Sequence, residues 1–124
     1  MIEEQFVSRD TARMLKEEGF DAPCYKQYSD IGIQWESMSP SNFNADDWGY
    51  SCPTQALAAR WLREEHNIHV FAFFDYVKRD WCYCIANLDA VTAEMGMDVS
   101  ENNYPTYEQA LEVALQEAIK LIKK

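Results

Sequence analysis

Basic residues, histidines and long apolar runs are all scarce in this chain. Its 11 Lys and Arg are outnumbered by 21 Asp and Glu, which gives a formal net charge of −10. Residues 80–119 contain eight acids and no Lys or Arg. Because phosphate binding needs Lys and Arg to displace condensed counterions, direct binding of nucleic acid is not expected. The acids favour solubility, and they leave open an acidic decoy that imitates nucleic acid toward a basic partner protein.

No segment of the sequence is suited to a membrane or to secretion. The longest purely apolar run covers only residues 70–74, whereas a membrane-spanning helix needs about 20 apolar residues. The N-terminus, Met1-Ile2-Glu3-Glu4, is acidic and lacks the apolar core of a signal peptide. We therefore predict a cytoplasmic protein that makes no contact with membranes.

Catalytic motifs are also missing, and no cofactor is expected. The four cysteines form no CxxC pair, and the sequence has neither a Gly-rich phosphate loop nor GxSxG. Cys52 precedes Pro53 at an expected helix start, where free N–H groups favour a thiolate. A thiol enzyme also needs a base, and about 20 Å of helix separates Cys52 from His66. No catalytic residue is predicted, and a thiol-dependent enzyme remains an alternative.

A metal site is not predicted either. His69, Cys82 and Cys84 can share one face of a hairpin, which is the reason to consider them as metal ligands. Their spacing matches no closed zinc site, and the neighbours Phe71 and Phe73 are typical of an apolar core. We therefore interpret the three residues as part of the core.

What the sequence does contain is a repeated helix end. Residues 13–18, RMLKEE, return as RWLREE at residues 60–65. Each copy ends a helical pattern and leads to a turn signal, at residues 29–32 and 77–80. The repetition predicts one domain, 1–124, built from two α-β-β units at about 8–36 and 53–88. A C-terminal helix at 106–123 completes it.

The expected fold is α+β in the order αββαββα. Ser8 or Asp10 can cap the first helix and Gly19 can end it, while Thr106 and Gln109 form a capping box for the last helix. The hairpins predict a mainly antiparallel sheet of about four strands, packed against three helices. Residues 37–51 lose all periodicity and are interpreted as a long loop, and residues 89–105 as an acidic loop.

The second hairpin, residues 68–76 and 81–88, is apolar on both faces. We take Tyr76 to face Trp81, which puts His69, Phe71 and Phe73 together on one face. Three helices cannot easily cover both faces, so the 37–51 loop or a second subunit is expected to cover this one. The candidate partner-binding residues lie on this face and in the loop: His69, Phe71, Phe73, Trp48 and Tyr50.

Three segments carry a resemblance to known proteins. They are MLKEEGFD at residues 14–21, PTQALAARWLREEHNI at 53–68 and YEQALE at 107–112. Through them most of the chain resembles small uncharacterised proteins of gut anaerobic bacteria and of their phages and mobile elements. The resemblance implies a cytoplasmic accessory protein, and it brings no activity, cofactor or site residue.

Three functions of different kinds follow as hypotheses. The leading one is a non-enzymatic accessory or protein-interaction protein that works through the sheet face or the long loop. Its partner would be another protein or a second copy of the chain. The alternatives are the acidic decoy and the thiol-dependent enzyme.

Overall fold

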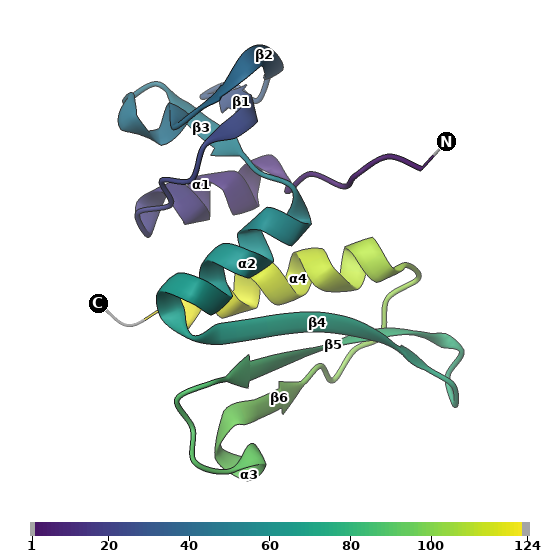
Figure 1. The fold of residues 1–124 in the computed structure, drawn as a ribbon. Helices are drawn as coiled ribbons and strands as arrows, with labels where there is room; N and C mark the ends of the chain where they lie inside the picture. The colour runs from purple at the N-terminus through teal and green to yellow at the C-terminus, as the bar shows by residue number, and fades with distance from the viewer. Residues whose placement is uncertain (1, 123–124) are drawn as a thin grey trace. The chain divides into compact units, whose positions relative to one another are not determined.

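The computed structural model describes residues 2–122, which form an α+β fold (Figure 1). In these residues there are four α-helices and two three-stranded antiparallel sheets, in the order αββηβαββ(α)βα. The predicted α+β class is confirmed, whereas the single sheet of about four strands is wrong. The contacts divide the chain into two compact units, with the boundary between Ala58 and Ala59.

The first unit joins one helix to one sheet. Helix α1 (Arg9–Glu17) begins at Ser8, whose Oγ accepts a hydrogen bond from the backbone N–H of Thr11 at 3.3 Å. It ends before Gly19, which has a φ of +88° as expected for a helix terminus. Strands β1 (Cys24–Ser29), β2 (Gln34–Ser41) and β3 (Gly49–Cys52) form a sheet in the order β2-β1-β3, and α1 contacts β3.

Residues 37–51 are not a loop, which corrects the prediction from the sequence. They contain the second half of β2, a 3-10 helix η1 (Phe43–Ala45) and most of β3. Polar side chains hold this segment together: Asn44 Oδ1 accepts from the Ser51 N–H at 2.8 Å, and Ser51 Oγ accepts from the Phe43 N–H at 3.0 Å. Polar side chains, whose frequency in the sequence predicted a loop, therefore accept hydrogen bonds from the backbone of this segment.

The second unit contains the longer hairpin. Helix α2 (Gln55–His66) crosses the boundary between the units, and Asn67, with a φ of +54°, turns the chain into β4 (Ile68–Asp75). Then follow β5 (Asp80–Asn87), α3 (Ala93–Gly96), β6 (Met97–Val99) and α4 (Tyr107–Lys120), with a sheet order of β4-β5-β6. The predicted acidic loop at 89–105 thus carries a strand. No helix in residues 2–122 is long and apolar enough to cross a membrane.

The hairpin register differs from the expected one by two residues. Phe74, rather than Tyr76, is opposite Trp81, and Asp75 and Asp80 form the last pair. Asp75 Oδ1 accepts hydrogen bonds from the N–H groups of Val77 and Lys78, so its side chain closes the turn. Because side chains alternate with a period of two, the shift leaves each residue on its predicted face.

Helix α4 covers one face of the second sheet. The Tyr107 ring at its start meets the Trp81 ring edge-on at 5.5 Å, and α4 contacts both β4 and β5. The buried residues of this interface lie on one side of the helix and on two strands: Ala110, Leu111, Ala114, Leu115, Ala118, Val70 and Ile85. The expectation that three helices share one sheet is wrong, since α1 contacts the first sheet and α4 the second.

Candidate functional site

The sheet face opposite α4 carries a continuous apolar surface. Phe71 is paired with Cys84, and Phe73 with Cys82, so these side chains share a face with His69. Strand β6 extends this face, because Met97 is paired with Ala86 and Val99 with Cys84. We call this surface the aromatic face: His69, Phe71, Phe73, Cys82, Cys84, Ala86, Met97 and Val99.

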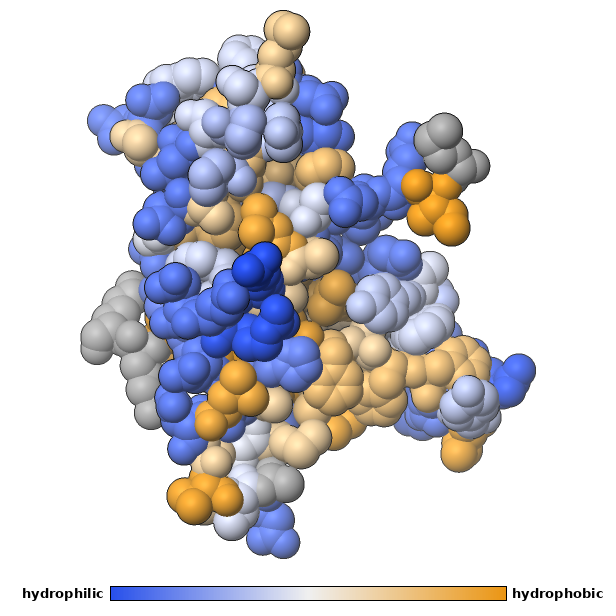
Figure 2. Space-filling view, viewed as in Figure 1, coloured by the Kyte–Doolittle hydropathy of each residue, from blue (hydrophilic) through white to orange (hydrophobic). Residues whose placement is uncertain are grey.

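The aromatic face is open at its margins and closed at its centre. On β4 the rings follow one another, with centroids 5.3 Å apart for His69 and Phe71 and 6.0 Å for Phe71 and Phe73. These three side chains are half-buried, whereas Met97 and Val99 are 49% and 56% exposed. Figure 2 shows apolar side chains gathered over β4. Apolar surface of this kind is typical of protein interfaces.

The candidate metal ligands lie together on this face, although the geometry around them is that of a core. Cys82 Sγ donates a long hydrogen bond of 3.8 Å to the Phe73 carbonyl, and both Cys82 and Cys84 are buried. His69 Nδ1 is buried without a hydrogen-bond partner among residues 2–122. In that part of the chain no three His, Cys, Asp or Glu side chains are arranged to hold a metal ion.

Burial holds three of the four thiols, those of Cys24, Cys82 and Cys84, in their protonated form. Burial, together with the nearby thiol of Cys52, raises the pKa of Cys24 to about 12 against an ordinary value of 9.0, and a hydrogen bond with Ser51 opposes this. Burial is also the main cause of the raised pKa values of Cys82 and Cys84. A nucleophilic cysteine needs a lowered pKa, so the environments of these cysteines disfavour thiolate chemistry.

Trp48 and Tyr50 lie in the first unit, whereas His69, Phe71 and Phe73 lie in the second. Trp48 is 50% exposed, and its ring is 6.0 Å from that of Trp35. The Tyr50 ring is engaged within its own unit, with the charged groups of Arg9 and Lys16 at 6.0 and 5.5 Å from its centroid. Tyr50 is therefore occupied by α1, and Trp48 is the more accessible of the two.

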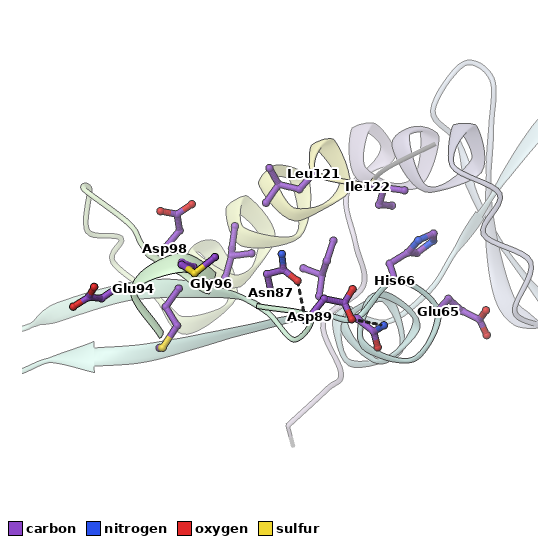
Figure 3. Close-up of a pocket in the computed structure, with 14 residues that line it drawn as sticks. Glu65, His66, Asn87, Asp89, Glu94, Gly96, Asp98, Leu121 and Ile122 are labelled. Atoms are coloured by element: carbon purple, nitrogen blue, oxygen red, sulfur yellow. Dashed lines mark hydrogen bonds between the residues drawn. The ribbon is translucent and has the colours of Figure 1, made fainter. Parts of the chain in front are cut away.

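A cavity of about 480 Å³ opens in the second unit where α2 and α4 end (Figure 3). That volume is in the range of about 300–1,000 Å³ that is usual for ligand pockets. Its apolar lining comes from both helices' ends, the sheet and α3: Ile68, Ile85, Met95, Met97, Leu121 and Ile122. Met97 also belongs to the aromatic face, so the cavity and the face adjoin.

Four carboxylates line the same cavity, and none of the lining residues within 2–122 is Lys or Arg. They are Glu65, Asp89, Glu94 and Asp98, and all four side chains are exposed. Asp89 Oδ1 accepts a hydrogen bond from Asn67 Nδ2 at 3.2 Å, and none of the four forms a salt bridge within residues 2–122. The cavity therefore combines a floor that includes the buried Ile68 and Ile85 with a rim of exposed carboxylates that form no salt bridge within residues 2–122. This combination favours a cation with an apolar stem.

Sequence reasoning missed this cavity because its residues are far apart along the chain. Glu94, Met97 and Asp98 fall in the segment expected to be an acidic loop. Met97-Asp98-Val99 does alternate apolar and acidic residues, as a strand would, but three residues are too few for a periodic signal.

Comparison of the chain with protein-family models, curated proteins and solved structures finds no match.

Proposed function

We propose that this chain is a non-enzymatic protein-interaction protein whose binding surface is the aromatic face. The observation that carries the proposal is the half-buried row His69, Phe71 and Phe73 on a sheet whose opposite face is covered by α4. Burial of such rings in an interface removes apolar surface from water, which contributes about 25 cal/mol for each Å² against the cost of association. An accessory role in a bacterium, phage or mobile element, as the resemblance implies, is part of the proposal.

Two features favour this function over a thiol enzyme. The raised pKa values of Cys24, Cys82 and Cys84 disfavour a thiolate nucleophile at these three positions, and Cys52 is 0% exposed. Aromatic and methionine side chains, which the face presents, are enriched in protein interfaces. The acidic-decoy alternative is supported by the rim of Glu65, Asp89, Glu94 and Asp98, which forms no salt bridge within residues 2–122. A decoy would act through that rim rather than through the rings.

A photo-crosslinking amino acid tests the surface directly. Replacing Phe71 with benzoylphenylalanine places the reactive ketone on the aromatic face, and illumination of the host cells should yield a defined crosslinked protein. Mass spectrometry then identifies it as a second copy or as another protein. The matched control carries the same group at Gln109, an exposed position on α4.

The expected result is a crosslink at Phe71 that is at least about tenfold stronger than the one at Gln109. A second variant, Phe71→Ser with Phe73→Ser, should abolish co-purification of the identified protein while far-ultraviolet circular dichroism stays unchanged. Equal crosslinking at both positions, or none at Phe71, would show that the aromatic face is not the binding surface.

A further inference from the structure

The tip of the second hairpin carries exposed apolar and cationic side chains, which are the groups that the acidic cavity can bind. We call residues 76–79 the hairpin tip, with Tyr76 and Val77 at 77% and 92% exposure and Lys78 and Arg79 exposed beside them. Apolar side chains that are exposed next to one another form a patch, and exposed patches are where protein contacts are made. The tip thus presents apolar and cationic groups together on a short projecting turn.

Of the two cations in the hairpin tip, Lys78 is held less closely against its own hairpin than Arg79. The guanidinium of Arg79 lies over the Phe74 ring at 5.4 Å from its centroid, which holds it against the hairpin. The Lys78 ammonium forms no salt bridge within residues 2–122. Asp75, the nearest acid in sequence, is engaged by the N–H groups of Val77 and Lys78 and by Asn103. Lys78 is therefore available to an acceptor on another molecule.

The cavity is the counterpart of this tip. Its floor accepts apolar groups such as Val77, and its rim carries four carboxylates that no cation of residues 2–122 neutralises by a salt bridge. Opposite electrostatic potentials on two surfaces speed their association and fix the relative position in which they bind. A lysine stem on the apolar floor with its ammonium at the rim also matches how such side chains are usually buried.

One molecule cannot join its own tip to its own cavity. The cavity is lined by Ile68 and Asn87, the first pair of the hairpin, whereas the tip follows Asp75 and Asp80, the last pair. Strands of this length rise about 3.3 Å for each residue, so roughly 23 Å separates the two ends. Only a second molecule can bring its tip to the cavity.

We propose that copies of this chain associate head to tail, with the hairpin tip of one copy in the acidic cavity of the next. The two surfaces are different, so the contact is heterologous and leads to rings or open chains rather than to a closed symmetric dimer. This association uses the hairpin tip and the cavity. It is therefore independent of the proposal that the aromatic face binds a protein.

Two charge-reversed variants of the full chain test the proposal in analytical ultracentrifugation. The tip variant is Lys78→Glu, and the cavity variant is Glu94→Lys with Asp98→Lys; all three side chains are exposed. The wild-type chain should increase in mass steadily with concentration. Each variant alone should associate at least about tenfold more weakly, as the coupling of close charge pairs predicts. Raising the salt concentration should weaken the wild-type association.

The decisive sample is an equal mixture of the two variants. The intact cavity of the tip variant can accept the intact tip of the cavity variant, and the reversed tip is in turn opposite in charge to the reversed cavity. Association is therefore expected to return in the mixture, at least about tenfold stronger than in either variant alone. The control, Glu3→Lys with Glu4→Lys, changes charge by the same amount outside the cavity and should associate like the wild type.

Three results would overturn the proposal. They are a wild-type chain that stays monomeric at 1 mM, a variant that associates as strongly as the wild type, and a mixture that stays monomeric. Thermal unfolding shows whether each variant is folded. If reversal disrupts folding, the neutral pair Glu94→Gln and Asp98→Asn replaces it, and a loss of association of at least about threefold is then expected. Crosslinks at Phe71 in a chain that fails these tests would still support the aromatic face.

Discussion

At the scale of the residue, Cys24 shows how burial determines the chemistry of a side chain. It is 4% exposed, donates a hydrogen bond to the Ala22 carbonyl, and lies close enough to Cys52 for a second negative charge to be unfavourable. Burial, and after it the neighbouring Cys52, raise the pKa of Cys24 to about 12. The thiol is therefore a small apolar group of the first unit at neutral pH.

Cys24 should make the stability of the chain sensitive to alkaline pH. The folded thiol keeps its proton to about pH 12, whereas the unfolded thiol loses it near 9.0, so this contribution is complete below pH 9 and falls between pH 9 and 12. Between pH 7.5 and pH 10 the urea midpoint of the wild type should fall further than that of Cys24→Ala, which has no thiol to ionise. Equal falls in both chains would contradict the burial of this thiol.

At the scale of the element, Gly96 joins α3 to β6 by a close approach of two backbones. A Cβ at this position would lie 2.5 Å from Ala90 Cβ and 2.9 Å from the Asn87 carbonyl oxygen. Gly19 is the opposite case: its φ is +88°, and nothing lies within 4 Å of an added Cβ. One glycine is required by packing and the other by backbone conformation.

Replacing these two glycines should separate the two effects. Gly96→Ala should lower the free energy of unfolding by about 1–3 kcal/mol because the Asn87 backbone must move. Gly19→Ala should cost about 1 kcal/mol through conformational strain alone. Urea unfolding measures both, and Glu94→Ala is the control within α3. Gly96→Ala with wild-type stability would show that the α3–β6 connection is looser than these distances imply.

At the scale of the whole molecule, a net charge of −10 acts against the compact state. Only three salt bridges occur in residues 2–122, and each joins exposed side chains within one helix. Such pairs contribute little, about 0–1 kcal/mol each. These three ion pairs therefore offset little of the repulsion expected from an excess of acids over bases.

Salt should therefore stabilise the isolated chain. Raising sodium chloride from 10 to 150 mM shortens the screening length from about 30 Å to about 8 Å. The thermal midpoint should rise by about 4 °C, which corresponds to roughly 1 kcal/mol for a chain of this size. Differential scanning calorimetry at low protein concentration measures it, because head-to-tail association would respond to salt in the opposite direction. A midpoint that falls with salt would contradict net repulsion.

The sequence alone determined the features that depend on near neighbours in the chain. Thr106 was predicted as a helix cap, and Ser8 as one of two candidates beside Asp10. The Oγ1 of Thr106 accepts a hydrogen bond from the Gln109 N–H at 3.1 Å. The faces of β4 and β5 also followed from alternation, which holds even though the register is shifted by two residues. Capping and alternation are local, so a single sequence carries them.

The tertiary structure alone decided how the strands are divided and where the cavity lies. Strands β3 and β6 are four and three residues long and exist because distant strands, β1 and β5, supply their hydrogen bonds. The cavity assembles the ends of α2 and α4 with β6, which no local pattern connects. Pairing across long separations in sequence depends on the whole fold, and the candidate binding surfaces depend on it too.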